Sequence, residues 1–137
     1  MIESYKNTVF NNYATFTGRA RRQEYWYFIL MNVIIVFAFF VPMFAFSDMN
    51  AIVGPWTIVG LSGYAIAMIL PTLALISRRL HDIGKSGWYY FVRFIPVIGP
   101  IWFLIMMCTA GDVGSNQYGN DPKQIKDEID EIGITRY

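Results

Sequence analysis

Two polar segments, residues 18–26 and 77–88, carry the side chains of this sequence that could do chemistry. They hold five arginines, two acids and the single histidine of the chain: Arg19, Arg21, Arg22, Arg78, Arg79, Glu24, Asp82 and His81. A guanidinium group is planar and can donate two parallel hydrogen bonds to one phosphate. These residues therefore predict a site for an anionic phospholipid headgroup or a membrane partner. The competing interpretation is that they are ordinary charges that set membrane topology.

Helical spacing predicts which of these charges pair with one another. If the helix that enters the second segment continues, Arg78 and Asp82 are four residues apart and can form an ion pair, whereas Arg79 points elsewhere and stays free. Glu24 could take an arginine of the second segment and so join the two segments. Paired in this way, the acids would make part of the cluster structural.

His81 is the residue best suited to acid–base catalysis, because a neighbouring carboxylate such as Asp82 can orient an imidazole. No nucleophile motif accompanies it, and Ser77 and Ser86 belong to no recognisable elbow. The sequence therefore predicts a structural hydrogen bond for His81 and no enzymatic activity.

The sequence predicts neither a metal site nor a cofactor. It has one histidine and one cysteine, too few for the usual zinc ligand sets. Oxygen-bearing side chains recur from Asp112 to Asp121, but their spacing does not match a calcium-binding EF-hand loop. A net charge of +1 gives no reason to expect a nucleic-acid partner.

Three apolar runs must position the polar segments: residues 25–46, 52–76 and 88–109. At about 1.5 Å per residue, each run is long enough to cross a hydrocarbon core of roughly 30 Å. The chain is 55% hydrophobic and 15% charged, whereas soluble domains carry about 25% charged residues. We therefore predict an all-α membrane protein with three transmembrane helices, in which residues 1–123 form one integral domain and residues 124–137 form a tail.

Two shorter helices are predicted outside these runs. Before the first run, Tyr5, Val9 and Tyr13 recur at helical spacing among polar residues, which is typical of an amphipathic helix lying at the membrane interface. After the third run, Asp121 and Pro122 are suited to the N-cap and first position of a short helix in the tail.

The distribution of basic residues predicts the orientation. Arginine and lysine lie in residues 1–24 and 77–87, whereas the connection 47–51 has neither. Since basic loops stay in the cytoplasm, the N-terminus is expected inside and, after three spans, the C-terminal tail outside. Pro96 and Pro100 interrupt the third run, and a kinked span is the simpler interpretation. A re-entrant hairpin would instead return the tail to the cytoplasm.

Two polar residues lie inside the apolar runs. Asn32 is two turns into the first run, and Arg93 is about one and a half turns into the third. Intramembrane charges are costly and often functional, but both residues lie near the predicted cytoplasmic face. We expect them to pair with each other, or Arg93 to extend toward the headgroups, in preference to a role in transport.

Three motifs together identify a resemblance to a known family. They are F-x-G-R-A-R-R-x-E-Y-W at residues 16–26, R-R-L-H-D-x-x-x-S-G-W at residues 78–88 and G-x-x-G-x-N-x-Y-G-x-D-P-K at residues 111–123. This succession resembles the YhaH/YhaI-like bacterial inner-membrane proteins, a domain-of-unknown-function family (number 805). The resemblance implies a small multi-pass protein of the bacterial cytoplasmic membrane and no established activity, so it assigns no catalytic role.

The predicted function is that of a non-enzymatic scaffold or accessory protein. It would bind anionic lipid, or a membrane partner, through the cytoplasmic arginine, histidine and aspartate cluster, either alone or as a homo-oligomer. A small oligomeric transporter or channel component is the first alternative, and an enzyme acting on lipid headgroups is the second.

Overall fold

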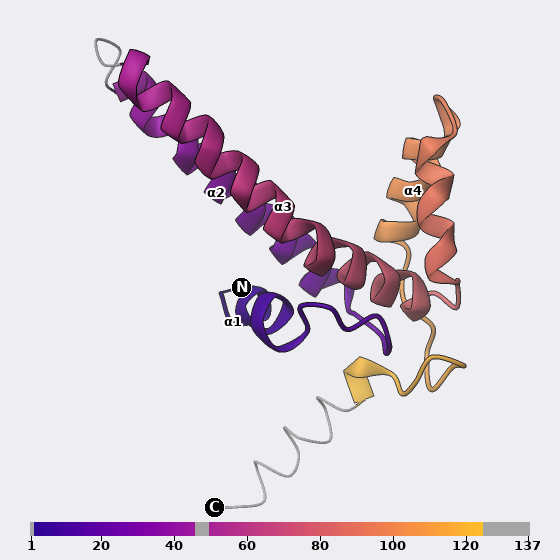
Figure 1. Ribbon diagram of the computed structural model, residues 1–137. Coiled ribbons are helices and arrows are strands. Elements are labelled where there is room, and N and C mark those ends of the chain that lie inside the picture. Colours follow the sequence, from indigo (N-terminus) through magenta and orange to yellow (C-terminus); the bar gives the residue numbers. More distant parts are fainter. Residues whose placement is uncertain (1, 46–49, 125–137) are drawn as a thin grey trace, which may run out of the picture.

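The computed structural model describes residues 2–45 and 50–124 of the 137-residue chain, and these residues form helices and loops (Figure 1). A short helix α1 (Ile2–Lys6) continues as a π-helical turn η1 (Asn7–Asn11). Two long helices follow, α2 (Arg22–Ala45) and α3 (Asn50–Asp82). A 3₁₀ helix η3 (Gly87–Phe94) and a helix α4 (Ile98–Cys108) complete the described elements.

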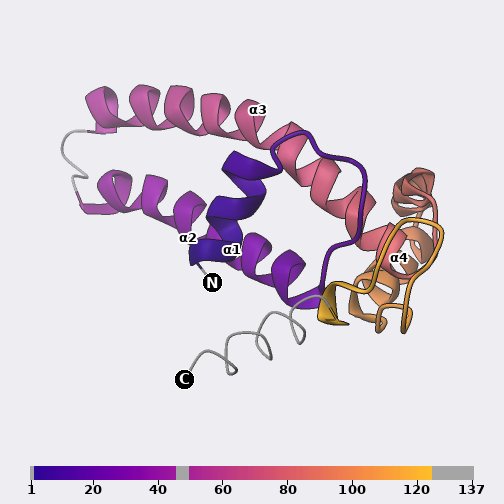
Figure 2. The ribbon, with the colours of Figure 1, turned by 90° about the horizontal axis from the view of Figure 1, so that it is seen from below.

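The long helices α2 and α3 lie side by side and antiparallel (Figures 1 and 2). Both are long and apolar enough to cross a membrane. The 33 residues of α3 extend about 50 Å. Large apolar side chains on their outer faces are exposed, among them Phe37 on α2 and Ile58 and Ile66 on α3. Such surfaces suit contact with lipid, so the structure agrees with the first two predicted spans.

The third apolar run does not form a third spanning helix. It folds into a hairpin whose arms are η3 and α4, and Figure 1 shows the two arms beside each other. Eight residues of 3₁₀ helix extend about 16 Å, and 11 residues of α-helix about the same. Each arm therefore reaches only about half of a hydrocarbon core of roughly 30 Å. The third run therefore forms a hairpin, as in the alternative interpretation, and the predicted single kinked helix is not formed.

Local backbone chemistry explains why the third run reverses. At the tip, Val97 has φ 65° and ψ −59°, and the Ile98 N–H donates to the Pro96 oxygen at 2.7 Å. This is a γ-turn of the rare, strained kind. A Cβ added at Gly99 would lie 2.3 Å from the Val92 oxygen, so glycine is needed where the arms meet.

The reversal brings the chain after α4 back to the end of α3. The Asp112 N–H donates to the Asp82 oxygen at 2.8 Å. The segment after α4 thus lies at the same end of the molecule as residues 18–26, whereas a third straight span would have carried it to the other end. Asp121 is the predicted N-cap, because its carboxylate accepts the Lys123 N–H at 2.9 Å. The rest of the predicted tail helix, from residue 125 on, lies outside the described residues.

The N-terminal helix lies across the α2–α3 pair (Figure 2). Tyr5 stacks on Phe28 of α2 with ring centroids 5.5 Å apart, and Val9 packs against the core. The Tyr13 hydroxyl donates to the Ala67 oxygen of α3 at 2.6 Å. The predicted amphipathic segment is thus helical only over residues 2–11, and it is partly buried by the protein itself.

The apolar core lies where the first turns of α2, the last turns of α3, and α4 meet. Its most completely buried side chains come from all three helices: Phe28, Leu75, Leu80 and Met107. The two polar segments meet at this same end of the molecule.

Candidate functional site

Asp82, the last residue of α3, is the centre of a buried cluster of charges. The Arg19 Nε donates to its Oδ1 at 3.0 Å, and the Arg79 Nη1 donates to its Oδ2. The side chains of Arg19, Asp82 and Arg79 are 1%, 5% and 0% exposed. We call these three residues the Arg–Asp–Arg cluster. One negative carboxylate thus faces two buried positive charges. Such an arrangement requires further hydrogen bonds to offset the free-energy cost of removing the charges from water.

The remaining donors of the two arginines supply those bonds. Arg19 donates through Nη1 to the Gly114 oxygen and through Nη2 to the Asp112 oxygen. Arg79 donates through Nη2 to the Thr109 oxygen, and its Nε lies 3.4 Å from the Met107 oxygen. The cluster therefore fastens the end of α4 and the segment after it to the end of α3.

Close backbone approach is part of this arrangement. A Cβ added at Gly111 would lie 2.1 Å from the Asp82 Oδ2, so only glycine lets the returning chain pass the carboxylate. Gly84, in the turn after α3, has φ 67° and lies against the side chain of Asp112. Gly111 is the first residue of the motif at residues 111–123, whereas Gly84 falls at an unspecified position of the motif at residues 78–88.

Glu24 joins the two polar segments, as predicted, through Arg78. The Arg78 Nη1 lies 3.4 Å from the Glu24 Oε1, which also accepts from the Thr8 hydroxyl at 3.2 Å. The Ala20 N–H donates to the Arg78 oxygen at 3.0 Å. Two further side-chain nitrogens of Arg78, Nε and Nη2, are buried without a hydrogen-bond partner.

The predicted pairing of Arg78 with Asp82, with Arg79 left free, is wrong. Arg79 is fully buried and pairs with Asp82 three residues ahead, while Arg78 turns to Glu24. The physical reason is the returning hairpin, whose carbonyl groups surround Arg79 and make its side of α3 the buried polar side.

His81 makes the expected structural hydrogen bond. Its Nδ1 is 3.2 Å from the Gly18 oxygen, and its ring stacks on Tyr118 at a centroid distance of 3.9 Å and an angle of 3°. The Asn116 side-chain amide donates to the His81 oxygen at 2.9 Å. Asp82 does not orient the imidazole: its carboxylate faces Arg19 and Arg79, whereas the His81 Nδ1 faces the Gly18 oxygen.

The other predicted arginines lie at the edge of the cluster. Arg21 donates to the Pro122 oxygen, and the exposed Arg22 lies 3.3 Å from the Cys108 oxygen. All eight predicted site residues therefore lie at one end of the molecule.

Asp121 lies in the segment that returns to this end. Hydrogen bonds from the backbone N–H groups of Lys123 and Gly114 lower the pKa of Asp121 below its ordinary value.

Asn32 and Arg93 do not form the predicted pair. Asn32 accepts from the Tyr64 hydroxyl at 2.6 Å and donates to the Phe28 oxygen at 2.8 Å. Arg93 instead lies over the rings of Tyr90 and Phe103, at 5.4 and 5.5 Å. The fold-back of the third run explains the difference, because it places Arg93 against its own hairpin.

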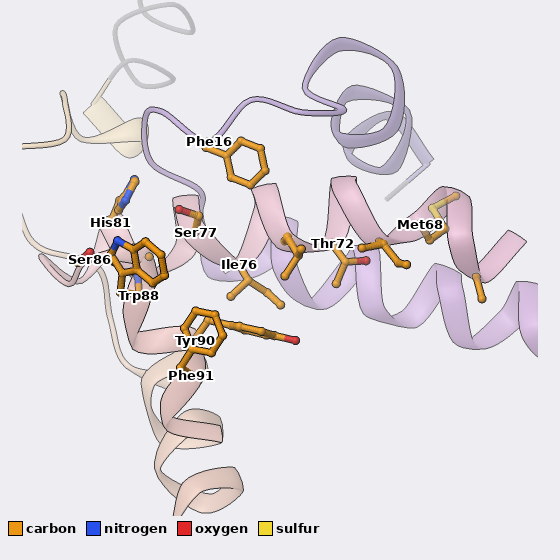
Figure 3. A pocket seen from close by; sticks show the side chains of 14 residues that line it. Phe16, Met68, Thr72, Ile76, Ser77, His81, Ser86, Trp88, Tyr90 and Phe91 are labelled. Atoms are coloured by element: carbon orange, nitrogen blue, oxygen red, sulfur yellow. Dashed lines mark hydrogen bonds between the residues drawn. The ribbon is translucent and has the colours of Figure 1, made fainter. Parts of the chain in front are cut away.

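A groove beside α3 was not foreseen from the sequence. Its volume is about 780 Å³, and we call it the α3–η3 groove (Figure 3). One face of α3 forms its floor, Phe16 lies on one side, and Tyr90 and Phe91 lie on the other. The apolar residues on one face of α3 were visible in the sequence. They form a groove only because the hairpin places η3 beside that face.

Comparison with known proteins places this geometry in a family. The family model described as a protein of unknown function, DUF805, matches residues 13–120. The chain is a member of the DUF805 family. The match includes the Arg–Asp–Arg cluster, both arms of the hairpin and Phe16, whereas α1, η1 and Asp121 lie outside it.

Curated DUF805-like relatives are membrane proteins. The chain is 43% identical to the inner membrane protein YhaI of Escherichia coli strain K12 over 117 residues, covering 85% of this chain and 92% of that protein. It is 39% identical to the inner membrane protein YhaH of the same strain over 120 residues, covering 84% and 93%. The uncharacterised protein YiiR of that strain is 25% identical over 141 aligned residues. No solved structure matches the chain. With its apolar helices, this DUF805 chain is a membrane protein.

Proposed function

We propose that this DUF805 protein is a non-enzymatic scaffold of the bacterial inner membrane that binds anionic phospholipid at its basic end. The observation that carries the proposal is the pairing of Asp82 with two buried arginines. A carboxylate held in this way is suited to holding the fold together, and the His81 Nδ1 faces the Gly18 oxygen instead of Asp82. The chemistry of the cluster is thus structural, and lipid binding falls to the exposed cations around it.

The charges at this end favour a cytoplasmic position. Residues 18–24, 77–87 and 111–124 together hold seven Lys or Arg and four Asp or Glu. The connection at the other end of α2 and α3 carries Asp48 and no basic residue. By the positive-inside rule, the N-terminal helix and residues 109–124 lie in the cytoplasm, joined by two spanning helices and a half-depth hairpin. The proposed topology replaces the expected extracytoplasmic tail.

Three exposed cations form what we call the basic rim: Arg22, Lys85 and Lys123. Each lies at an end of a membrane-embedded element or in the returning segment, at the level where headgroups begin. A basic side chain near an anionic leaflet contributes about 1 kcal/mol of attraction. The rim is therefore expected to enrich anionic over zwitterionic lipid.

Native mass spectrometry of the full chain, released from vesicles of phosphatidylethanolamine and phosphatidylglycerol, tests lipid binding. Arg22→Gln with Lys85→Gln is expected to lower the retained phosphatidylglycerol by about thirtyfold, since two contacts of about 1 kcal/mol are lost. Lys6→Gln removes one exposed charge outside the rim and is the matched control for Lys85→Gln alone. Equal retention in these two single variants would refute the rim.

Topology is tested separately. A reporter that is active only in the cytoplasm, fused after Tyr137, should be active, and so should one fused before residue 1. A reporter inserted in the 46–49 connection should be inactive. An inactive C-terminal fusion would show that the hairpin crosses the membrane after all.

A further inference from the structure

We propose that the α3–η3 groove holds one acyl chain of a phospholipid from the cytoplasmic leaflet, with the headgroup phosphate at the Ser77, His81 and Ser86 end. The inference rests on the proposed membrane orientation and names where the lipid binds. It concerns a site separate from the basic rim, because the groove is lined by α3, η3 and Phe16.

The dimensions of the groove suit one leaflet. Its lining on α3 runs from Ala65 to His81, which is about 24 Å of helix. Half of a bilayer with its headgroups is about 20–22 Å thick. A volume of about 780 Å³ lies within the range of roughly 300–1,000 Å³ typical of small-molecule sites. The groove is therefore about as long as one lipid.

The polarity of the groove changes along its length as that of a lipid does. Its body is lined by apolar side chains such as Ile69, Leu73 and Phe91. Three polar side chains, Ser77, His81 and Ser86, gather at one end, and Met68 lies toward the other (Figure 3). Thr72 and Tyr90 add one hydroxyl each between the two ends. The polar end of the groove is the end of α3 at which the basic rim lies. The headgroup of the bound lipid would therefore lie at the same depth in the membrane as the rim.

The polar end is built to offer hydroxyl groups. The Ser86 hydroxyl oxygen accepts from the Trp88 N–H at 3.4 Å, which leaves its proton free to donate. A Cβ added at Gly87 would lie 2.5 Å from the Ser77 Oγ, so glycine keeps that hydroxyl uncovered. Two hydroxyl donors suit the oxygens of a phosphodiester.

Membrane lipid is the occupant that the surroundings favour. Phe94 and Val97 at the hairpin tip are 65% and 79% exposed, and Ile66 on α3 is 70% exposed. These side chains place the groove within the same hydrocarbon layer as the hairpin. An occupant there needs an apolar body and a polar end, which a phospholipid of the leaflet has at high local concentration.

Photo-crosslinking tests the inference on the full chain. The protein is placed in vesicles of phosphatidylethanolamine and phosphatidylglycerol that contain a phosphatidylglycerol with a diazirine near the end of one acyl chain. Crosslinks are expected on groove residues such as Ile69 and Leu73, well above those on Ile66, which is exposed on the same helix outside the groove. Uniform labelling around α3, or labelling that avoids the groove because a protein segment fills it, would overturn the inference.

Paired variants give an independent measure. Ile69→Trp fills the groove, whereas Ile66→Trp adds the same bulk one turn away. Since overpacking costs about 1–3 kcal/mol, groove labelling should fall at least about fivefold in the first variant and stay unchanged in the second. At the headgroup end, Ser77→Ala should lower retained lipid and Ser62→Ala should not. Equal labelling in the two tryptophan variants, with both folded by circular dichroism, contradicts the proposal.

The two proposals fail in different ways. If the basic rim is wrong but the groove is right, Arg22→Gln with Lys85→Gln leaves retention unchanged while the groove is still labelled. If the groove is wrong but the rim is right, that double variant loses phosphatidylglycerol while labelling around α3 is uniform.

Discussion

Replacing Asp82 by asparagine should be among the most destabilising single changes in this protein. The substitution keeps the shape of the side chain and removes one negative charge. It leaves Arg19 and Arg79, whose side chains are 1% and 0% exposed, as two buried cations without a counter-ion. Because both arginines also hold the segment after α4, the hairpin should separate from the end of α3.

The expected magnitude follows from burial. Breaking a buried ion pair by removing one partner costs about 3–5 kcal/mol, because a buried charge is left uncompensated. The folded-to-unfolded ratio then falls by roughly two to three and a half powers of ten. Asp112→Asn makes the same chemical change at an exposed carboxylate nearby, and its cost should stay within about 0.5 kcal/mol.

Denaturation in detergent micelles, followed by tryptophan fluorescence, measures both variants. Trp88 and Trp102 lie on the two arms of the hairpin and report its separation directly. A second substitution sharpens the test. Adding Arg79→Met to Asp82→Asn removes one of the uncompensated cations, so the double variant should be more stable than Asp82→Asn alone.

Two results would refute this reasoning. If Asp82→Asn costs no more than Asp112→Asn, the Arg–Asp–Arg cluster is not a buried network in the folded protein. If Arg79→Met lowers the free energy of unfolding as much in the Asp82→Asn variant as in the wild type, the two residues are not coupled.

Three further predictions concern the hairpin and the segment after it. Gly99→Leu should destabilise the protein by about 1–3 kcal/mol in the same assay, because a side chain there meets the opposite arm, whereas Gly63→Ala, with open space around it, should be neutral or slightly stabilising. Val97→Gly should stabilise the hairpin, because strain of about 1–3 kcal/mol exceeds the glycine penalty of about 0.5–1 kcal/mol; an unchanged midpoint would contradict a strained tip. Asp121→Asn should weaken the dependence of stability on acidic pH. Because the pKa of Asp121 is lowered in the folded state, its carboxylate stabilises the fold above its ordinary pKa of 3.8, and this effect is lost as pH falls. Between about pH 5 and 3 the free energy of unfolding of the wild type should therefore fall more than that of the variant.

Local patterns in the sequence predicted the parts of the fold that local chemistry decides. The first two apolar runs predicted α2 and α3, and the turn residues followed by Asp121 and Pro122 predicted an N-cap. The joint between Glu24 and an arginine of the second segment was also predictable, since both residues had to lie at the same end of an antiparallel helix pair. These features depend on periodicity and charge alone.

The path of the third run could not be predicted in the same way. A kinked span and a reversed hairpin place the same prolines at the same interruption, and they differ in what the two arms contact. The deciding contacts are the close approach at Gly99 and the bonds from Arg79 to carbonyl groups at the end of α4. The partner of Arg79, the isolation of Asn32 from Arg93 and the α3–η3 groove all follow from this one reversal.

The position of the arginines has a common explanation in the end of α4. The last carbonyl groups of a helix lack intrahelical partners, and inside a membrane leaving them unpaired is costly. Here Arg79 lies within reach of the Met107 oxygen, Arg22 of the Cys108 oxygen, and the Thr109 hydroxyl donates to the Ile105 oxygen at 2.7 Å. Cations also suit the negative end of the helix dipole. In the proposed topology the hairpin ends at the membrane interface, and Arg22 and Arg79 there would stabilise the re-entrant form without requiring any substrate.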